Sequence, residues 1–304
     1  MHTREKKRAP RNHARKRSAS AAAPALFPAR VAATTAAYLV TADRGCKDEL
    51  ATLRREHKEL HDAMFEATRV QRKLCAPREM RRNGFEIAGE MFAVRQLSGD
   101  FLKILDLGSA VGLAVGDIAG KGISAALWLA HVVGLIRVFA AQHPDLAHAA
   151  GAINRELCAL VAEPPLAALF LARLDTLTGE LIYVNAGQPS ALLICHGGAV
   201  EELNHGGPML GAVPHAEFVC GRVILQHGDT LLACTDGAFE CRNPREEEFG
   251  AQRLAAAVAA AGSVAASQIL FSTLAAALDF AGPRKLDDDL TLLVVHHRVA
   301  SLPA

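Results

Sequence analysis

Residues 111–122 read VGLAVGDIAGKG, an apolar run that ends in an aspartate and a glycine-rich turn. Residues 111–118 have the composition of a buried β-strand, and the polar, glycine-rich residues after them are typical of a turn. Asp117 lies at the end of this strand. A carboxylate in that position is costly unless another group neutralises its charge. The stretch therefore predicts a buried strand with functional chemistry at its end.

Three further acidic positions share this setting. They are Asp100 in LSGDF, Asp236 in CTDG and the acidic run 287–289 before LTLL. Several carboxylates that converge would repel one another, and the usual remedy is a divalent cation. Oxygen ligands favour Mg²⁺ or Mn²⁺ over zinc. Any one of these aspartates is explained equally well as a turn or helix-cap residue, but all four in this order favour a metal centre.

The rest of the chain is organised in blocks of strands and helices. Strands are predicted over 85–94, 101–107 and 111–118, followed by helices over 123–142 and 145–161. Later strands are predicted over 167–174, 181–185, 191–195, 219–225, 230–235 and 290–297, with helices over 251–261 and 265–281. Strands joined by short turns pair antiparallel, which differs from the β-α-β order of a parallel sheet. The expected fold class is α+β, with helices on the outer faces of antiparallel sheets.

Motifs spread over residues 71–298 resemble the metal-dependent protein phosphatase (PPM, type 2C) superfamily. The similarity is to its bacterial branch of stage-II-sporulation-protein-E and sigma-factor-regulator phosphatases. The motifs that carry it are Ser98-Gly99-Asp100, Gly116-Asp117-Ile118-Ala119-Gly120-Lys121-Gly122, Asn185-Ala186-Gly187, Gly207-Pro208-Met209-Leu210-Gly211, Thr235-Asp236-Gly237, Phe249-Gly250 and Asp288-Asp289-Leu290-Thr291. The resemblance implies a four-layer α-β-β-α sandwich.

The resemblance also implies a role for each acidic residue. Asp117 would bridge two Mn²⁺ or Mg²⁺ ions, with the backbone carbonyl of Ile118 as a further ligand. Asp236 and Asp288 would hold the first ion, and Asp100 would serve the second directly or through water. Asp117 and Asp236 are the predicted catalytic carboxylates. The implied reaction is hydrolysis of a phosphoserine or phosphothreonine by a metal-activated water, and the implied substrate is a phosphorylated anti-sigma-factor antagonist.

Three residues depart from the pattern of the family, namely Ser98, Lys121 and Gln188. None of them is an implied metal ligand. Lys121 could attract a phosphate, or it could be a solvent-facing lysine at a helix start. The alternative function is a degenerate phosphatase fold that binds a phosphoprotein without hydrolysing it. Such a protein is expected to have lost a metal carboxylate, and the presence of all four here favours the enzyme.

The positive charge of the chain is concentrated at its beginning. Eight basic residues and one acid precede Ser18, which leaves 25 basic and 31 acidic residues, a net charge of −6, in the remainder. Residues 1–45 are interpreted as a basic, Ala-rich, flexible tail. A nucleic-acid patch or a targeting peptide is the alternative. No aromatic residue interleaves the basic run and the body is acidic, so we expect no nucleic-acid binding.

A helix is predicted over 46–76, between this tail and a phosphatase domain at 77–300. Leu50, Leu53, His57, Leu60, Met64, Ala67, Gln71 and Leu74 form a 3-4 seam along it. Such a seam indicates a coiled coil, and hence a possible homodimer, although His57 and Gln71 weaken it. The alternative is an amphipathic helix that packs on the domain that follows.

The seven cysteines contain no C-x-x-C pair, which argues against a disulfide framework or a zinc site. No uninterrupted apolar run of the roughly 20 residues that a membrane span requires is recognised. The sequence thus predicts reduced thiols, no membrane span and cytoplasmic residence.

Overall fold

Strand β4 (Ala110–Ile118) contains residues 111–118 of the stretch quoted first, and every residue of the strand except Asp117 is buried. It pairs antiparallel with β3 (Phe101–Asp106) on one side and β5 (Ala167–Asp175) on the other. Both of its faces are covered, which explains a continuous apolar run rather than an alternating one. The computed structural model describes residues 27–76, 78–94 and 96–298.

The strands form two sheets. The first has the order β1 (Glu79–Arg82), β2 (Phe85–Phe92), β12 (Leu290–His297), β11 (Thr230–Cys234), β7 (Ala191–Ile194) and β8 (Val200–Leu203). The second has the order β10 (Gly221–Ile224), β6 (Glu180–Ala186), β5, β4 and β3, and the two-residue β9 (Gly206–Gly207) joins β6 in parallel. All other pairs are antiparallel, as predicted.

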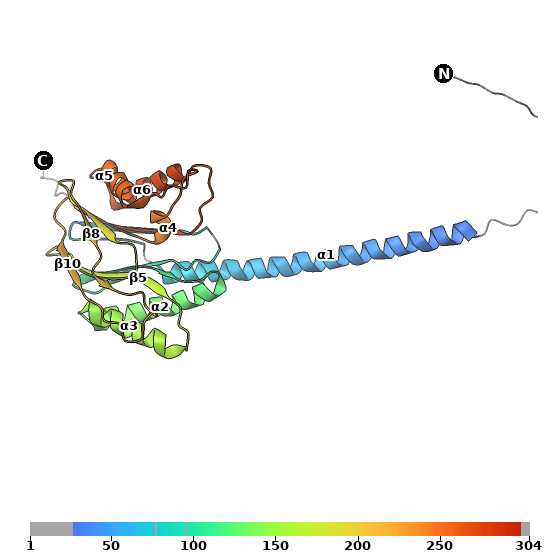
Figure 1. The fold of residues 1–304 in the computed structure, drawn as a ribbon, viewed down its shortest axis with the longest axis horizontal. Coiled ribbons are helices and arrows are strands. Elements are labelled where there is room, and N and C mark those ends of the chain that lie inside the picture. The colour runs from blue at the N-terminus through green and yellow to red at the C-terminus, as the bar shows by residue number, and fades with distance from the viewer. Residues whose placement is uncertain (1–26, 77, 95, 299–304) are drawn as a thin grey trace, which may run out of the picture. The chain divides into compact units, whose positions relative to one another are not determined.

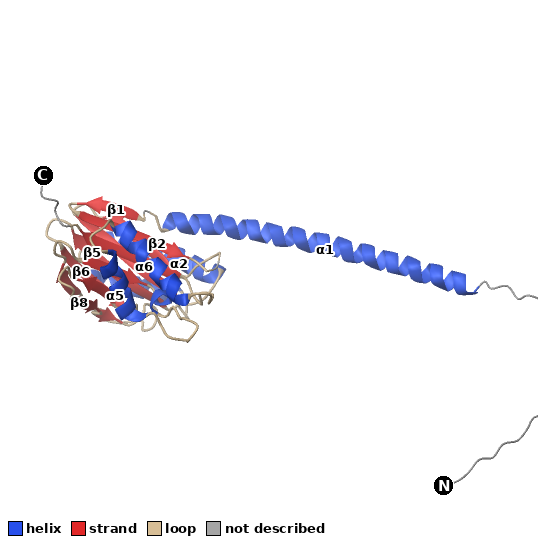
Figure 2. Ribbon diagram, turned by 90° about the horizontal axis from the view of Figure 1, so that it is seen from above, coloured by secondary structure: helices blue, strands red, loops and turns tan. Residues whose placement is uncertain are grey.

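Helices cover the outer face of each sheet, as Figures 1 and 2 show. Helices α2 (Ile123–Gln142) and α3 (Leu146–Leu160) pack on the second sheet, while α5 (Gly250–Ala261) and α6 (Ala266–Ala281) pack on the first. The short α4 (Asp236–Phe239) follows β11 directly. Asp145 caps α3, because its side chain accepts a hydrogen bond from the backbone N–H of Ala147. The α-β-β-α sandwich expected from the resemblance is confirmed.

The pleat of β12 shows how the layers are held together. Leu293 and Val295 belong to the large core between the two sheets. Leu292 and Val294 point to the opposite face and join the core beneath α5 and α6. Because successive side chains alternate faces, one apolar strand serves both cores.

Helix α2 is long and apolar enough to cross a membrane by length and composition alone. The sequence analysis did not single it out. In the structure, one face of the helix is buried, with Leu129, Val132 and Ile136 in the large core. Packing on a sheet accounts for the apolar residues of this face, whereas Ile123, Leu127 and Val138 of the same helix are exposed.

Helix α1 runs over Phe27–Leu74. The prediction of an unstructured tail to residue 45 was therefore wrong for residues 27–45. Alanine is the best helix former and recurs throughout this stretch, and Pro28 is tolerated because it lies in the first turn. The basic run before Ser18 lies outside the described residues. By their internal contacts residues 1–60 and 61–304 are separate units.

Candidate metal centre

The four acidic positions come from the ends of two neighbouring strand pairs. Asp100 directly precedes β3 and Asp117 is the penultimate residue of β4, its antiparallel neighbour. Asp236 begins α4 after β11, and Asp288 lies just before β12, which pairs with β11. Each sheet thus contributes two aspartates. The topology brings all four to the same edge of the sandwich.

Asp100 links the two sheets through its carboxylate. Its Oδ2 accepts hydrogen bonds from the hydroxyls of Thr235 (2.7 Å) and Thr291 (2.6 Å), both from the first sheet. Asp100 is only 4% exposed. Burial raises its pKa well above the ordinary value, the two hydroxyls oppose this effect, and the negative charge of Asp117 adds to it. A buried carboxylate that is held by two hydroxyls and faces another carboxylate is suited to a cation.

Asp117 is affected by the charges of both strand pairs. Desolvation, followed by the negative charges of Asp236 and Asp288, raises its pKa to about 6. Partial desolvation and the charge of Asp288 also raise the pKa of Asp236. The charges of Asp236 and Asp288 therefore lie close enough to disfavour ionisation of Asp117, and the charge of Asp288 acts on Asp236 in the same way. A divalent cation among them would reverse that penalty.

The acidic run 287–289 divides into three roles. Asp287 pairs with Arg284 at 2.9 Å. Asp289 is buried, and its Oδ1 accepts the backbone N–H of Val94 at 2.6 Å. This leaves Asp288 as the member whose charge acts on Asp117 and Asp236. Asp289 also acts on the site, since its negative charge contributes to the raised pKa of Asp100, and the metal-binding role of Asp288 stays a prediction.

Two glycines allow the backbone to close around this edge. A Cβ at Gly99 would lie 2.6 Å from the carbonyl oxygen of Ile118 and 2.7 Å from Oδ1 of Asp117. A Cβ at Gly237 would lie 2.0 Å from the carbonyl oxygen of Asp289. Only glycine fits at either position. The space at Gly99 faces the Ile118 carbonyl oxygen and Oδ1 of Asp117, the two oxygens that the resemblance assigns to metal binding.

These residues fit a divalent cation as an open site. No group of three or more His, Cys, Asp and Glu side chains among residues 27–76, 78–94 and 96–298 is close enough to form a closed metal cage. Mg²⁺ usually retains several waters in place of a complete set of protein ligands, so a site of this kind does not require a closed cage. The individual ligand roles stay predictions.

A small cavity of about 100 Å³ lies at this edge. Asp117, Asp288 and the exposed Lys121 line it together with Gly99. An ammonium beside the carboxylates could attract a phosphate, as one of the two interpretations of Lys121 requires. Gln188 does not line this cavity. It is buried, and its backbone N–H donates to Oδ1 of Asn185 (2.8 Å).

The sequence analysis missed a contact between the end of α1 and the loop that carries Asp100. Nε2 of Gln71 donates to the carbonyl of Ser98 (2.7 Å), and Oε1 of Gln71 accepts the backbone N–H of Ser98 (3.4 Å). Oγ of Ser98 in turn accepts the backbone N–H of Asp100 at 2.9 Å. Lys103 donates to the carbonyls of Leu74 (2.6 Å) and Ala76 at the end of the helix. The polar Gln71 inside the predicted seam was the feature of the sequence that could have indicated this contact.

A sandwich of two sheets between helix layers, with aspartates gathered at one edge, defines the PP2C type of phosphatase fold. A solved PP2C domain of SiaA from Pseudomonas aeruginosa has this fold, with a TM-score of 0.68 and 20% identity over 79% of this chain and 98% of that one. The family model described as Stage II sporulation protein E (SpoIIE) matches residues 108–298. The chain belongs to the SpoIIE family.

Two further proteins show how far the similarity extends. Phosphoserine phosphatase RsbU of Bacillus subtilis is 23% identical over 83% of this chain and 75% of its own length. The structure of the RsbU and RsbW domains of a Mycobacterium tuberculosis protein is 26% identical, with a TM-score of 0.62 over 73% of this chain and 62% of that one. The chain also spans 30% of the length of Protein IcfG of Synechocystis, with 27% identity. It therefore matches only part of some relatives.

The raised pKa of Asp117 predicts how pH affects the metal-free protein. The folded-state pKa of about 6 exceeds the unfolded value of about 4, so the folded state retains the proton more strongly. This contribution to stability is complete below about pH 4 and is lost as pH rises through about 6. We expect urea unfolding in chelator to show a free energy about 1 kcal/mol lower at pH 8 than at pH 5 from this group, allowing for partial exposure. Asp117→Asn should reduce the pH difference, and an unchanged difference would contradict the assignment.

Proposed function

We propose that this protein is a Mg²⁺- or Mn²⁺-dependent phosphatase of phosphoserine and phosphothreonine in proteins. The observation that carries the proposal is the gathering of Asp100, Asp117, Asp236 and Asp288 at one edge, where burial and neighbouring negative charges raise the pKa values of the first three. Membership of the SpoIIE family and similarity to a protein named phosphoserine phosphatase support it. A catalytically inactive phosphoprotein-binding fold is the alternative, and the presence of all four carboxylates argues against it.

Each residue of the site has a distinct part in this chemistry. Two bound cations would lower the pKa of a water molecule and offset negative charge on the phosphoryl oxygens. Asp117 would hold both, with the Ile118 carbonyl beside it, while Asp236 and Asp288 would hold one. Thr235 and Thr291 fix the carboxylate of Asp100. Lys121, at the rim of the cavity, would draw the anionic substrate toward the carboxylates.

We also propose that the substrate is a phosphorylated anti-sigma-factor antagonist in the cytoplasm. The support is family membership and similarity to two chains described by the name RsbU, one of them joined to an RsbW domain. A protein substrate also suits the open edge on which the aspartates lie, because a folded partner can present a phosphorylated loop there.

Phosphate release from a phosphoserine peptide tests the proposed reaction. We expect hydrolysis when Mn²⁺ or Mg²⁺ is added and none in the presence of a chelator. Because metal binding should also stabilise the folded state, the thermal midpoint should rise with metal concentration. Hydrolysis that continues in chelator, or metal binding without hydrolysis of any phosphopeptide or small phosphate ester, would contradict the proposal.

The helix at 50–74 is proposed to join two copies of the chain. Leu50, Leu53 and Leu60 of the seam are 44%, 56% and 56% exposed, so this half is available to a second helix. Gln71 and the neighbouring Cys75 are instead buried against the catalytic domain. We therefore propose that the first part of the seam pairs with a second copy of the helix, while its last part packs on the domain that follows.

Deleting residues 1–60 should therefore yield a folded phosphatase in which the two copies are no longer joined, so the mass per particle should fall by more than the mass of the deleted residues. A deletion to residue 76, the predicted end of the helix, would also remove the buried Gln71 and Cys75 and the carbonyl groups that bind Lys103. Light scattering would measure the mass, and peptide hydrolysis would measure the activity. If the mass per particle falls only by the mass of the deleted residues, and activity is unchanged, the helix does not join subunits.

A further inference from the structure

A second cavity, of about 260 Å³, lies next to the candidate metal centre. It is formed by α4, the loop after it and the segment that precedes β12. Three basic residues line it, namely Arg242, Arg284 and Lys285, together with four acidic ones, Asp236, Glu240, Asp287 and Asp288. The cavity therefore places three basic side chains beside Asp236 and Asp288, two of the predicted metal ligands.

Two of the basic side chains already bind a carboxylate from the chain itself. Arg284 contacts Glu246 and also pairs with Asp287. Arg242 lies 3.9 Å from Glu246 and 2.7 Å from Glu248. Two arginines that are far apart in the sequence thus converge on Glu246. Lys285 is exposed and has no ion pair with any residue in the described part of the chain.

The backbone of Glu246 is held in an unfavourable conformation. Its φ of 61° lies in the left-handed region, which non-glycine residues rarely adopt. The only other described non-glycine residue with a positive φ is Asn83, which occupies an Asn-Gly hairpin turn where this conformation is usual. Oδ1 of Asn243 accepts the backbone N–H groups of Arg245 and Glu247, which fixes the loop around Glu246. The loop therefore places this carboxylate against the arginines at a cost in backbone energy.

We propose that Arg242, Arg284 and Lys285 form a subsite for an acidic segment of the substrate, next to its phosphorylated residue, and that Glu246 pairs with the two arginines when no substrate is bound. The inference rests on the proposed phosphatase function. Guanidinium groups suit carboxylates because their donors match the two oxygens. Exchange of one carboxylate for another leaves the arginines paired throughout, and Lys285 supplies a charge for a second acidic residue.

Two labelled phosphoserine peptides test the subsite, one with glutamates beside the phosphoserine and one with glutamines in the same places. With Mn²⁺ and the full chain, we expect kcat/KM to be about tenfold higher for the glutamate peptide. Arg284→Gln should remove most of this preference and leave hydrolysis of p-nitrophenyl phosphate unchanged. Glu246→Gly should raise kcat/KM for the glutamate peptide, because it removes the competing carboxylate and glycine adopts a positive φ freely.

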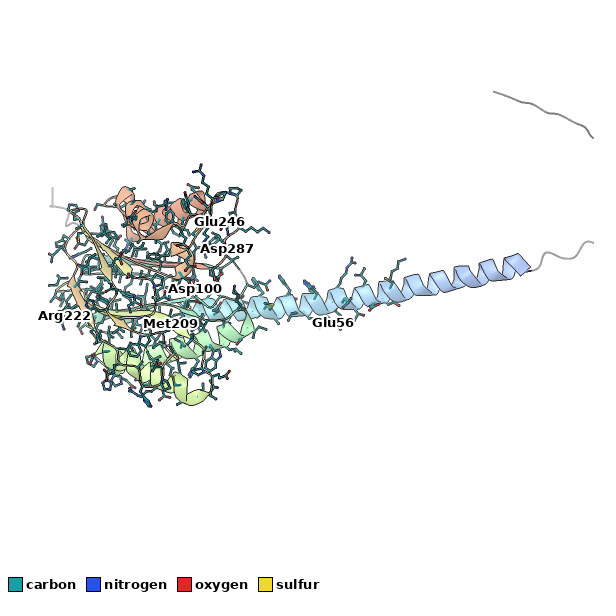
Figure 3. The ribbon with its side chains drawn as sticks, in the orientation of Figure 1. Glu56, Asp100, Met209, Arg222, Glu246 and Asp287 are labelled. Atoms are coloured by element: carbon teal, nitrogen blue, oxygen red, sulfur yellow. The ribbon has the colours of Figure 1, made fainter. Side chains whose placement is uncertain are left out.

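Arg222→Gln is the matched control. Arg222 also pairs with a glutamate, Glu180, but lies at the opposite edge of the sandwich from Glu246, Asp287 and Asp100 (Figure 3). Anisotropy of the labelled peptides is measured in parallel. Tighter binding of the glutamate peptide without hydrolysis of any substrate would retain the subsite and contradict the phosphatase. Hydrolysis and binding that do not distinguish the two peptides, or a preference that survives Arg284→Gln, would overturn the subsite and leave the phosphatase standing.

Discussion

Replacing Asp117 with asparagine is expected to lower phosphate release by on the order of 10³-fold at saturating Mn²⁺. The change keeps the size of the side chain and removes the charge that would be shared by both cations. We propose this role for Asp117 because β4 places it near Asp100 on its own sheet and near Asp236 and Asp288 on the other. Phosphate release from a phosphoserine peptide would measure the loss. Turnover near that of the wild type would rule out the two-metal assignment.

The same variant should be more stable than the wild type without metal. At pH 8 the carboxylate is ionised against the desolvation and repulsion that raise its pKa to about 6, and asparagine removes that penalty. We expect a gain of about 1 kcal/mol in chelator and a smaller rise of the thermal midpoint on addition of Mn²⁺. Asp106→Asn is the control, because Asp106 lies at the other end of β3 and pairs with Arg82. It should change neither activity nor the response to metal.

The sequence predicted the layers well because they depend on local apolar patterns. The helix at 123–142 has the predicted bounds, and the bounds of β4 differ by one residue. The elements that were missed are short or exposed, such as β1, whose residues alternate between exposed and partly buried, and the two-residue β9. Their pairing is fixed by neighbouring strands, and their own composition carries little signal.

The candidate site was predicted only as a set of residues. Asp287, Asp288 and Asp289 are chemically identical, and only their partners separate them, since Arg284 takes the first and the backbone of Val94 the third. The contact between Gln71 and Ser98 was indicated only by the polar Gln71 inside the seam, because an apolar seam looks the same whether it faces another helix or a domain. The resemblance to a family supplied the ligand roles, which the fold is compatible with and which mutagenesis can test.

Gly99→Ala is expected to lower phosphatase activity by about 10²-fold without the removal of any charge. The added Cβ would lie within 2.7 Å of both the Ile118 carbonyl oxygen and Oδ1 of Asp117, so the two strand ends would have to move apart. A displacement of roughly 1 Å at reacting groups is enough for a loss of this size. Peptide hydrolysis over a range of Mn²⁺ concentrations would measure it, and we expect a higher metal requirement together with the lower rate.

Gly134→Ala separates this effect from a general sensitivity to alanine. Gly134 is exposed on α2 and a Cβ there would meet no atom within 4 Å, so the substitution should leave activity unchanged and stabilise the helix by about 0.5–1 kcal/mol. If Gly99→Ala instead retains activity and its dependence on Mn²⁺, the Ile118 carbonyl and the Asp117 carboxylate do not require the space that glycine leaves. The cations would then have to be held at the remaining carboxylates, away from the junction of β3 and β4.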